Sequence, residues 1–259
     1  LVMERMSAVI YKGSALARPI LGKKSTLEKM SGTWLREYKR THYLPDRVVV
    51  SLAGSFEDSF VEELKERFSG MEPGQLGKSK AVVYHPALTL KRKATEQNHL
   101  LLAFPSISDV DPRRFAMQLL SSILGGGMSS RLFQEVRERQ GLCYNIYTYG
   151  AGYQEIGTFH IYAALGKETE QQALAAIRQA VERFAEEGVS QAELDRVREL
   201  AKANVLMGLE STTARMNHMA RSALRQEPVR NEEEIIAAYD SVTAEQIREL
   251  AQETFQWDQ

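Results

Sequence analysis

The stretch from Leu119 to Tyr149 reads LLSSILGGGMSSRLFQEVRERQGLCYNIYTY and contains the pattern from which the fold is predicted. Its apolar residues recur at helical spacing and stop at Gly125, Gly126 and Gly127. Glycine often follows the last turn of a helix because it adopts backbone conformations that are closed to other residues. The three glycines therefore predict a helix end followed by a loop.

A second helix and two strands follow the glycines. Residues 132–139 have helical character and stop at Gly141, and residues 143–149 combine the aromatic and β-branched residues typical of a strand. A further strand at 158–165 is predicted to pair with the first one through a long turn. This part of the chain is thus expected to form a hairpin preceded by two helices.

The remaining part of residues 80–259 supplies more strands and then a series of helices. Strands are predicted at 81–84 and 99–104, and helices at 111–125, 170–187, 190–208, around 216–223 and at 243–255. Ser190 with Glu193, and Thr243 with Gln246, have the spacing of residues that cap helix starts. Strands that come early and helices that come late favour an α+β fold over alternating βαβ units.

The beginning of the chain has a pattern of its own. Ser25 to Glu28 has the spacing of a capping box and predicts a helix that runs to Tyr43. Residues 47–53 are a β-branched run that predicts a strand, and residues 56–68 return to helical spacing. One strand and two or three helices are too few to close and cover a sheet.

The composition changes between these two parts. Residues 71–79 are rich in glycine, proline and serine and poor in apolar residues, which is typical of a linker. We therefore expect residues 1–70 to be the C-terminal remainder of a preceding domain and residues 80–259 to be a complete second domain. Leu1 is not a methionine, so the chain is interpreted as a piece of a longer protein.

Charge and cysteine content narrow the classes of partner. The 33 basic and 34 acidic residues give a net charge of −1, which offers no general attraction for nucleic acid. No run approaches the roughly 20 apolar residues of a membrane helix, so no membrane partner is expected. The single cysteine excludes an internal disulfide and suits a reducing, cytoplasmic setting.

The sequence gives little support for a zinc site, a cysteine nucleophile or a phosphate-binding loop. The five histidines lack the i, i+4 pairing of a zinc helix, and H-x-x-E-H is absent, so no metal ligands are predicted in this chain. Cys143 lies in an apolar strand and is interpreted as a small buried hydrophobe rather than a nucleophile. The glycine run lacks the GK[ST] ending of a P-loop, so the evidence for a phosphate-binding site is weak.

Two residues stand out after the glycines, Arg137 and Tyr144, which are seven positions apart. Taken alone, Arg137 could belong to a solvated charged helix face, and Tyr144 could pack with one edge in water. The residues by themselves leave this alternative open beside a role in binding.

The segment from Leu119 to Tyr149 resembles the C-terminal domain of the family of pitrilysin, insulinase and mitochondrial processing peptidase. ARPILG at 17–22, YKRTHYLPDRVVVSLAG at 38–54 and LESTTARMNHMARSAL at 209–224 resemble family segments in the same order. The resemblance implies a mainly antiparallel sheet with helices packed on one face. It also implies a clamshell of two such domains around a peptide, with zinc on the first one.

The resemblance assigns roles to particular residues. Arg137 and Tyr144 match the pair that binds the substrate backbone and stabilises the tetrahedral intermediate, and the loop of Gly125, Gly126 and Gly127 would contact the peptide. The zinc ligands of the parent protein would lie upstream of Leu1, so this chain alone is expected to be inactive.

The expected partners are a peptide or unfolded polypeptide, the zinc-bearing domain and, in the case of an exposed sheet edge, a second copy in a homodimer. The predicted function is the substrate-binding part of a zinc-dependent endopeptidase. The alternative is a non-catalytic partner or scaffold subunit of the same fold, because the family also contains such domains.

Overall fold

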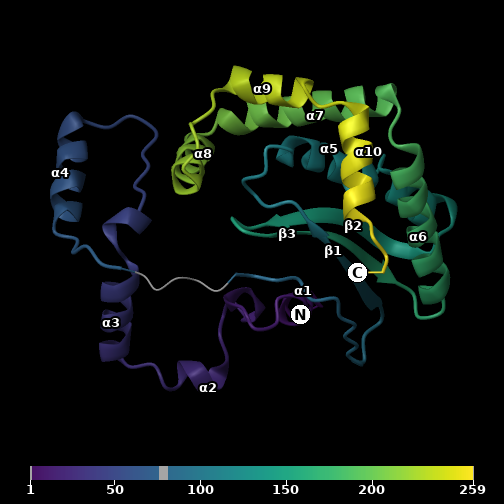
Figure 1. Ribbon diagram of the computed structural model, residues 1–259, viewed down its shortest axis with the longest axis horizontal. Helices are drawn as coiled ribbons and strands as arrows, with labels where there is room; N and C mark the ends of the chain where they lie inside the picture. The colour runs from purple at the N-terminus through teal and green to yellow at the C-terminus, as the bar shows by residue number, and fades with distance from the viewer. Residues whose placement is uncertain (1, 76–80, 259) are drawn as a thin grey trace. The chain divides into compact units, whose positions relative to one another are not determined.

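The computed structural model describes residues 2–75 and 81–258 (Figure 1). These residues form two compact units. One unit comprises the described residues within 1–19, 81–204 and 233–259, and the other comprises those within 20–80 and 205–232. The division at 71–79 stays a prediction, and its residues 76–79 lie outside the described residues.

A three-stranded antiparallel sheet forms the centre of the first unit, in the order β1-β3-β2. The strands are β1 (Asn98–Ser106), β2 (Cys143–Gly152) and β3 (Gly157–Leu165). The predicted strands at 99–104, 143–149 and 158–165 and their hairpin are therefore confirmed. The long turn of the hairpin joins β2 directly to the central strand.

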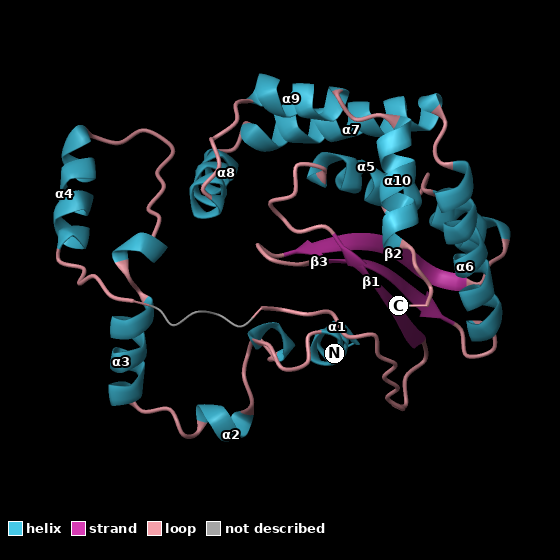
Figure 2. Cartoon of the chain, viewed as in Figure 1, coloured by secondary structure: helices cyan, strands magenta, loops and turns pink. Residues whose placement is uncertain are grey.

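Helices pack on one face of this sheet (Figure 2). They are α5 (Arg114–Gly125), α6 (Glu170–Glu187) and α10 (Ala244–Thr254). Phe159 and Ile161 of β3 alternate with polar neighbours, are fully buried and point to this face. There the ring of Phe255 meets the ring of Phe159 edge-on, with 5.3 Å between the ring centres. The α+β class and the packing of these three helices on one face are as predicted.

The short helix α1 (Val2–Ile10) packs against β1 in the same unit. Ile10 and the following Tyr11 are fully buried, and the Tyr11 hydroxyl lies 2.9 Å from the Oγ1 atom of Thr158. Thr158 alternates with Phe159 along β3, so this contact lies on the face opposite the helix layer.

The strand predicted at 81–84 is wrong. The backbone of His85 donates a hydrogen bond to the Ile10 carbonyl, and the Tyr84 hydroxyl donates one to the Ala103 carbonyl, each near 2.9 Å. The segment is anchored by single contacts instead of a ladder, so its β propensity is not expressed as a strand.

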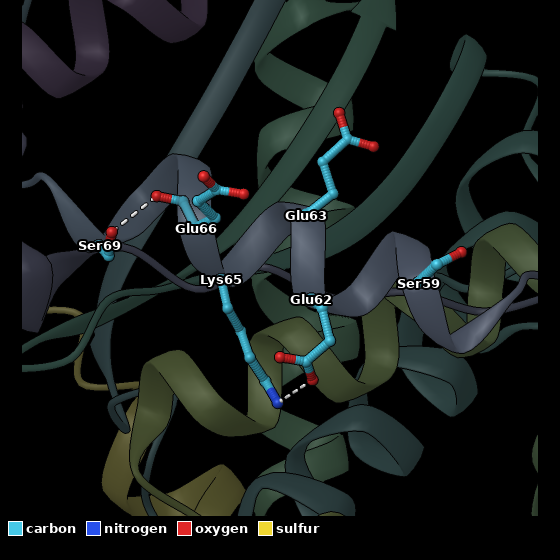
Figure 3. A pocket seen from close by; sticks show the side chains of 6 residues that line it. All are labelled: Ser59, Glu62, Glu63, Lys65, Glu66 and Ser69. Carbon is cyan, nitrogen blue, oxygen red and sulfur yellow. Dashed lines mark hydrogen bonds and ion pairs between the residues drawn. The ribbon is translucent and has the colours of Figure 1, made fainter.

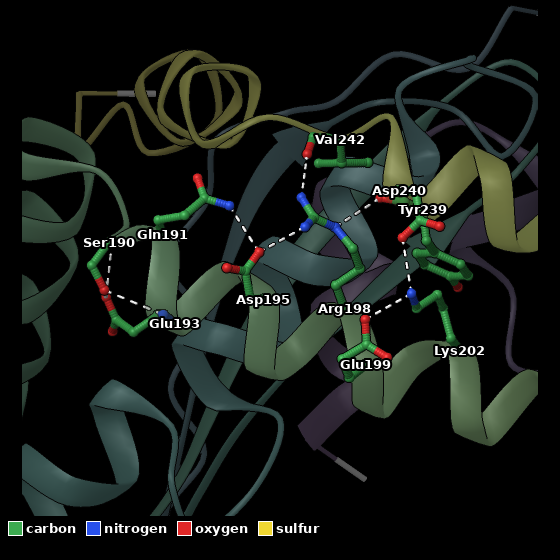
Figure 4. Close-up of polar contacts among 10 residues, drawn as sticks. All are labelled: Ser190, Gln191, Glu193, Asp195, Arg198, Glu199, Lys202, Tyr239, Asp240 and Val242. Carbon is green, nitrogen blue, oxygen red and sulfur yellow. Dashed lines mark hydrogen bonds and ion pairs between the residues drawn. The ribbon is translucent and has the colours of Figure 1, made fainter.

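Three more helices complete the C-terminal half, and they are α7 (Gln191–Leu209), α8 (Thr212–Arg225) and α9 (Glu232–Asp240). The predicted caps are present, because Ser190 and Glu193 hydrogen-bond each other reciprocally, as do Thr243 and Gln246. Arg198 of α7 donates to the Val242 carbonyl at 2.7 Å, which fixes the turn after α9 (Figure 4).

The second unit consists of helices and irregular segments. Besides α8 it contains α2 (Lys24–Leu27), α3 (Gly32–His42), the 3₁₀ turn η2 (Pro45–Arg47) and α4 (Asp58–Ser69). The helix predicted at 56–68 is confirmed. The single helix predicted from Ser25 is wrong, because Ser31 caps a separate helix by accepting from the Trp34 amide at 3.1 Å.

The strand predicted at 47–53 is also wrong. Within the described parts of the chain, no other strand pairs with this segment. A β-branched run forms a strand only when a neighbour accepts its backbone hydrogen bonds, so the local propensity alone does not suffice.

Candidate functional site

The glycine loop joins a buried helix end to an exposed turn. Gly125 ends α5 and is buried, and a Cβ atom there would come within 2.5 Å of the Thr148 Cγ2 atom and 2.7 Å of its backbone nitrogen. Gly126 and Gly127 are exposed, and a Cβ atom at Gly127 would meet open space. Gly125 thus allows α5 to approach β2, while the other two present backbone to solvent.

The helix predicted at 132–139 is present as the π-helix η3 (Phe133–Arg139). Its end is fixed by backbone hydrogen bonds of 3.0 Å from Gly141 to the Arg137 carbonyl and from Leu142 to the Val136 carbonyl. Gly141 has a φ of +62°, which favours glycine. A π-helix is a rare element that frequently lies at functional sites.

Arg137 is partly exposed near the end of η3. Its side chain is 39% exposed, its guanidinium lies 4.5 Å from the centre of the Phe133 ring, and its one ion pair among the described residues is with Glu138 at 3.5 Å. An ion pair of this length leaves several of the five N–H donors available. The guanidinium is thus placed by the Phe133 ring and the Glu138 carboxylate, and its remaining donors could bind a ligand.

Tyr144 lies at a β-bulge. Cys143 pairs with Leu165 and Asn145 pairs with Ala164, so Tyr144 is the extra residue between two ladder pairs. Its side chain is 61% exposed. Bulges redirect side chains and are frequent beside active sites.

Arg137 and Tyr144 share no hydrogen bond among the described contacts. The link between them is the Leu142–Val136 bond together with Cys143, which is buried as predicted. Burial raises the pKa of the Cys143 thiol, and the nearby Arg137 charge acts in the opposite direction. A raised pKa disfavours the thiolate, so this cysteine is a poor nucleophile.

Arg131 anchors the start of the same segment. Its guanidinium binds the Glu193 carboxylate at 2.8 and 3.0 Å and the Gly188 carbonyl at 2.9 Å. Arg131 thus makes three hydrogen bonds through its Nε and Nη2 atoms, whereas Arg137 has one ion pair among the described residues. The loop and η3 are therefore tied to the corner between α6 and α7.

An aromatic cluster on the sheet face opposite α5, α6 and α10 was not predicted. Tyr147 lies 4.8 Å from Tyr162, and Tyr149 stacks on His160 at 4.7 Å between ring centres. Burial raises the pKa of Tyr149 to about 12. The spacing of two in the sequence puts 147 with 149, and 160 with 162, on one side of each strand. The register of β2 with β3 brings the two pairs together, because Tyr147 pairs with Tyr162 and Tyr149 with His160.

No group of three or more His, Cys, Asp or Glu side chains in residues 2–75 and 81–258 could hold a metal ion. The described residues therefore do not offer the donors that a protein zinc site needs. None of the helices in these ranges combines the length and apolar character of a membrane span.

Comparison with known proteins identifies the family of this chain. The family described as "Peptidase M16 inactive domain" matches residues 29–200. The "uncharacterized zinc protease YmxG" of Bacillus subtilis is 33% identical over the whole chain, and "uncharacterized zinc protease SCO5738" of Streptomyces coelicolor is 31% identical over 97% of it. The chain spans 63% and 57% of the lengths of these relatives.

A solved structure has the same fold. The crystal structure of the peptidase M16 inactive domain from Pseudomonas fluorescens superimposes with a TM-score of 0.82 and 22% identity, covering 98% of this chain and 61% of that one. The resemblance seen around residues 119–149 is thus confirmed at the level of the family. The chain belongs to the peptidase M16 inactive domain family.

Proposed function

We propose that this chain holds the peptide substrate of a zinc-dependent endopeptidase. The observation that carries the proposal is the placement of Arg137 in a π-helix and Tyr144 at a β-bulge, seven residues apart and both accessible. Two backbone irregularities beside two accessible polar side chains support a binding role over a solvated surface. Family membership supports a role in proteolysis.

The chemistry follows from the donors. The Arg137 guanidinium and the Tyr144 hydroxyl would donate hydrogen bonds to carbonyl oxygens of a bound peptide beside the scissile bond. If they reach the oxygen on which negative charge develops, they bind the tetrahedral intermediate more tightly than the substrate and lower the barrier. Gly126 and Gly127 would let the peptide backbone approach closely, because no side chain intervenes.

The proposal places the zinc ion on another domain of the longer protein. Zinc would activate the attacking water, and its ligands would come from an H-x-x-E-H segment on a zinc-bearing domain in the longer protein. Because the described residues offer no such ligands, the role proposed for this chain is binding and orientation.

Peptide binding tests the role of this chain directly. Anisotropy of a labelled, uncharged Ser- and Ala-rich peptide should show about tenfold weaker binding for Arg137→Ala and a few-fold weaker binding for Tyr144→Phe, as expected for lost hydrogen bonds. Arg139→Ala is the matched control, since Arg139 is exposed two residues away and should bind unchanged.

Cleavage by the longer protein tests the catalytic part. Both substitutions at Arg137 and Tyr144 should lower kcat/KM, and rates within about threefold of the unaltered protein, less than 1 kcal/mol in barrier, would contradict the oxyanion role. Unchanged peptide binding in both variants would instead favour a non-catalytic scaffold of the same fold.

A further inference from the structure

The side chain of Gln134 reaches back from η3 to the glycine loop. Its Nε2 atom donates a hydrogen bond of 2.7 Å to the carbonyl oxygen of Met128, the residue that follows Gly127. We propose that Gln134 is a positioning residue, which holds this loop in the conformation that receives the peptide backbone. The proposal rests on the function proposed above, because the loop acts on a peptide only if the chain binds one.

A run of three glycines needs restraint from its surroundings. Glycine has more backbone conformations open to it than other residues, so an unrestrained glycine loop would populate many of them. Gly125 is fixed by its close approach to Thr148. The Gly126 amide donates to the Ser122 carbonyl at 3.1 Å. These two contacts restrain only the side of the loop that joins α5.

The other side of the loop is held through two carbonyl oxygens. The Gly127 carbonyl accepts from the Ser130 hydroxyl at 2.6 Å and from the Ser130 amide at 3.0 Å, and Ser130 itself is buried. The Met128 carbonyl accepts from Gln134, and no second donor to it is found in the described part of the chain. Gln134 is therefore the contact that fixes the peptide unit after Gly127.

Side chains that return to a nearby carbonyl are common in helices, and this explains Ser130 but not Gln134. Figure 3 shows the ordinary case in α4, where the Ser69 hydroxyl donates to the Glu66 carbonyl, three residues earlier, at 2.7 Å. Ser130 repeats this spacing with Gly127. Gln134 instead spans six residues and reaches from η3 into the loop before it, so its bond does not belong to the helix itself.

Global stability does not account for the contact either. Gln134 and Met128 are exposed, so water would replace the bond if it opened, and the net gain in the free energy of unfolding is small. What the bond limits is the set of conformations open to the loop. Its effect should therefore appear in the mobility of the loop and in ligand binding, and not in the unfolding midpoint.

Holding the two carbonyls also sets the direction of the amides bonded to them. In a trans peptide the C=O and N–H groups of one unit point in opposite directions. The Met128 and Ser129 N–H groups therefore point away from the donors that hold the loop, and neither meets an acceptor among the described residues. A loop held in this way would present N–H groups to the carbonyl oxygens of a peptide that lies along Gly126 and Gly127.

Nuclear magnetic resonance tests the contact on the full chain without a peptide. Gln134→Met keeps the length of the side chain and removes the donor, so the order parameters of the Gly127 and Met128 amides should fall from about 0.85, typical of rigid backbone, toward 0.6. Gln134→Lys restores a donor at similar helix propensity and should restore the order parameters. Thermal unfolding of both variants should match that of the unaltered chain.

Anisotropy of the same labelled, uncharged Ser- and Ala-rich peptide tests the consequence for binding. Gln134→Met should bind it about three- to tenfold more weakly, as expected when one hydrogen bond that orders the site is lost. Gln134→Lys should stay within about twofold of the unaltered chain. Gln172→Met is the matched control, because Gln172 is exposed on α6 and its side chain makes no hydrogen bond among the described contacts.

Three results would overturn the proposal. They are unchanged order parameters in Gln134→Met, a mobile loop that binds the peptide as tightly as before, and a failure of Gln134→Lys to restore binding. Failure of the proposed function is recognised separately, since it would appear as unchanged peptide binding by Arg137→Ala, whereas the order parameters report on the Gln134 contact in the free chain.

Discussion

The Nε2 atom of His160 lies 2.9 Å from the Oγ1 atom of Thr158, and its Nδ1 atom has no partner among the described residues. The ring is buried against Tyr149. Burial lowers the pKa of His160 from 6.5 to about 4, because the charged imidazolium is poorly solvated there.

This histidine makes the fold sensitive to mild acid. Above pH 6.5 the imidazole is neutral in both the folded and unfolded chain, so it has no pH-dependent effect on stability. Between pH 6.5 and 4 the unfolded chain binds the proton first, and unfolding should become easier by up to about 3 kcal/mol. His160→Phe should reduce the dependence of the free energy of unfolding on pH, measured by urea unfolding. His85→Phe, at an exposed position, should leave that dependence unchanged.

Glu193 should make the free energy of unfolding depend on pH in a second, more acidic range. The bidentate Arg131 bond, followed by the Ser190 amide and hydroxyl, lowers its pKa from 4.5 to about 2. This stabilisation is complete above pH 4.5 and is lost as the pH falls toward 2, and Glu193→Gln should remove roughly 2 kcal/mol at neutral pH. Glu187→Gln is an exposed control on the neighbouring helix, and an equal loss there would contradict the assignment.

The glycine loop should tolerate substitution unevenly. Gly125→Ala forces a Cβ atom against Thr148 and should lower the free energy of unfolding by about 1–3 kcal/mol, as overpacking does. Gly127→Ala meets open space and should have little effect on stability. Chemical denaturation of the two variants measures the difference, and equal midpoints would mean that α5 can move away from β2.

Two isoleucines near the start of the chain, one buried and one exposed, allow a controlled comparison. Ile10 is 1% exposed and Ile20 is 99% exposed. Ile10→Ala should cost about 2–4 kcal/mol, because it leaves a cavity beside the sheet, whereas Ile20→Ala should cost less than about 0.5 kcal/mol. Similar unfolding midpoints for both variants would show that α1 does not contribute to the folded unit.

Patterns that are satisfied within a segment were predicted well from sequence. The bounds of α6 follow from its apolar stripe and from Gly188, which has a φ of +70° at the helix end. The cap at Thr243 depends on residues three positions apart, so tertiary structure does not alter it. The hairpin of β2 and β3 likewise joins neighbours in the chain.

Patterns that need a distant partner were predicted less well, although the strand at 99–104 was predicted and pairs with β3. Residues 47–53 and 81–84 have the composition of strands but no ladder within the described structure. The π form of η3 depends on hydrogen bonds around Gly141, and the bulge at Tyr144 depends on its register with β3. Periodicity does not encode either feature.

The sequence by itself determined the family, the positions of the helices and strands around residues 119–149, and the identity of the two candidate residues, Arg137 and Tyr144. Only the tertiary structure decided how those residues are exposed, that α1 packs on the sheet, and that Tyr149 stacks on His160. The physical reason is that propensity and capping act over a few residues. Burial, register and charge clustering instead depend on segments that folding brings together from far apart in the chain.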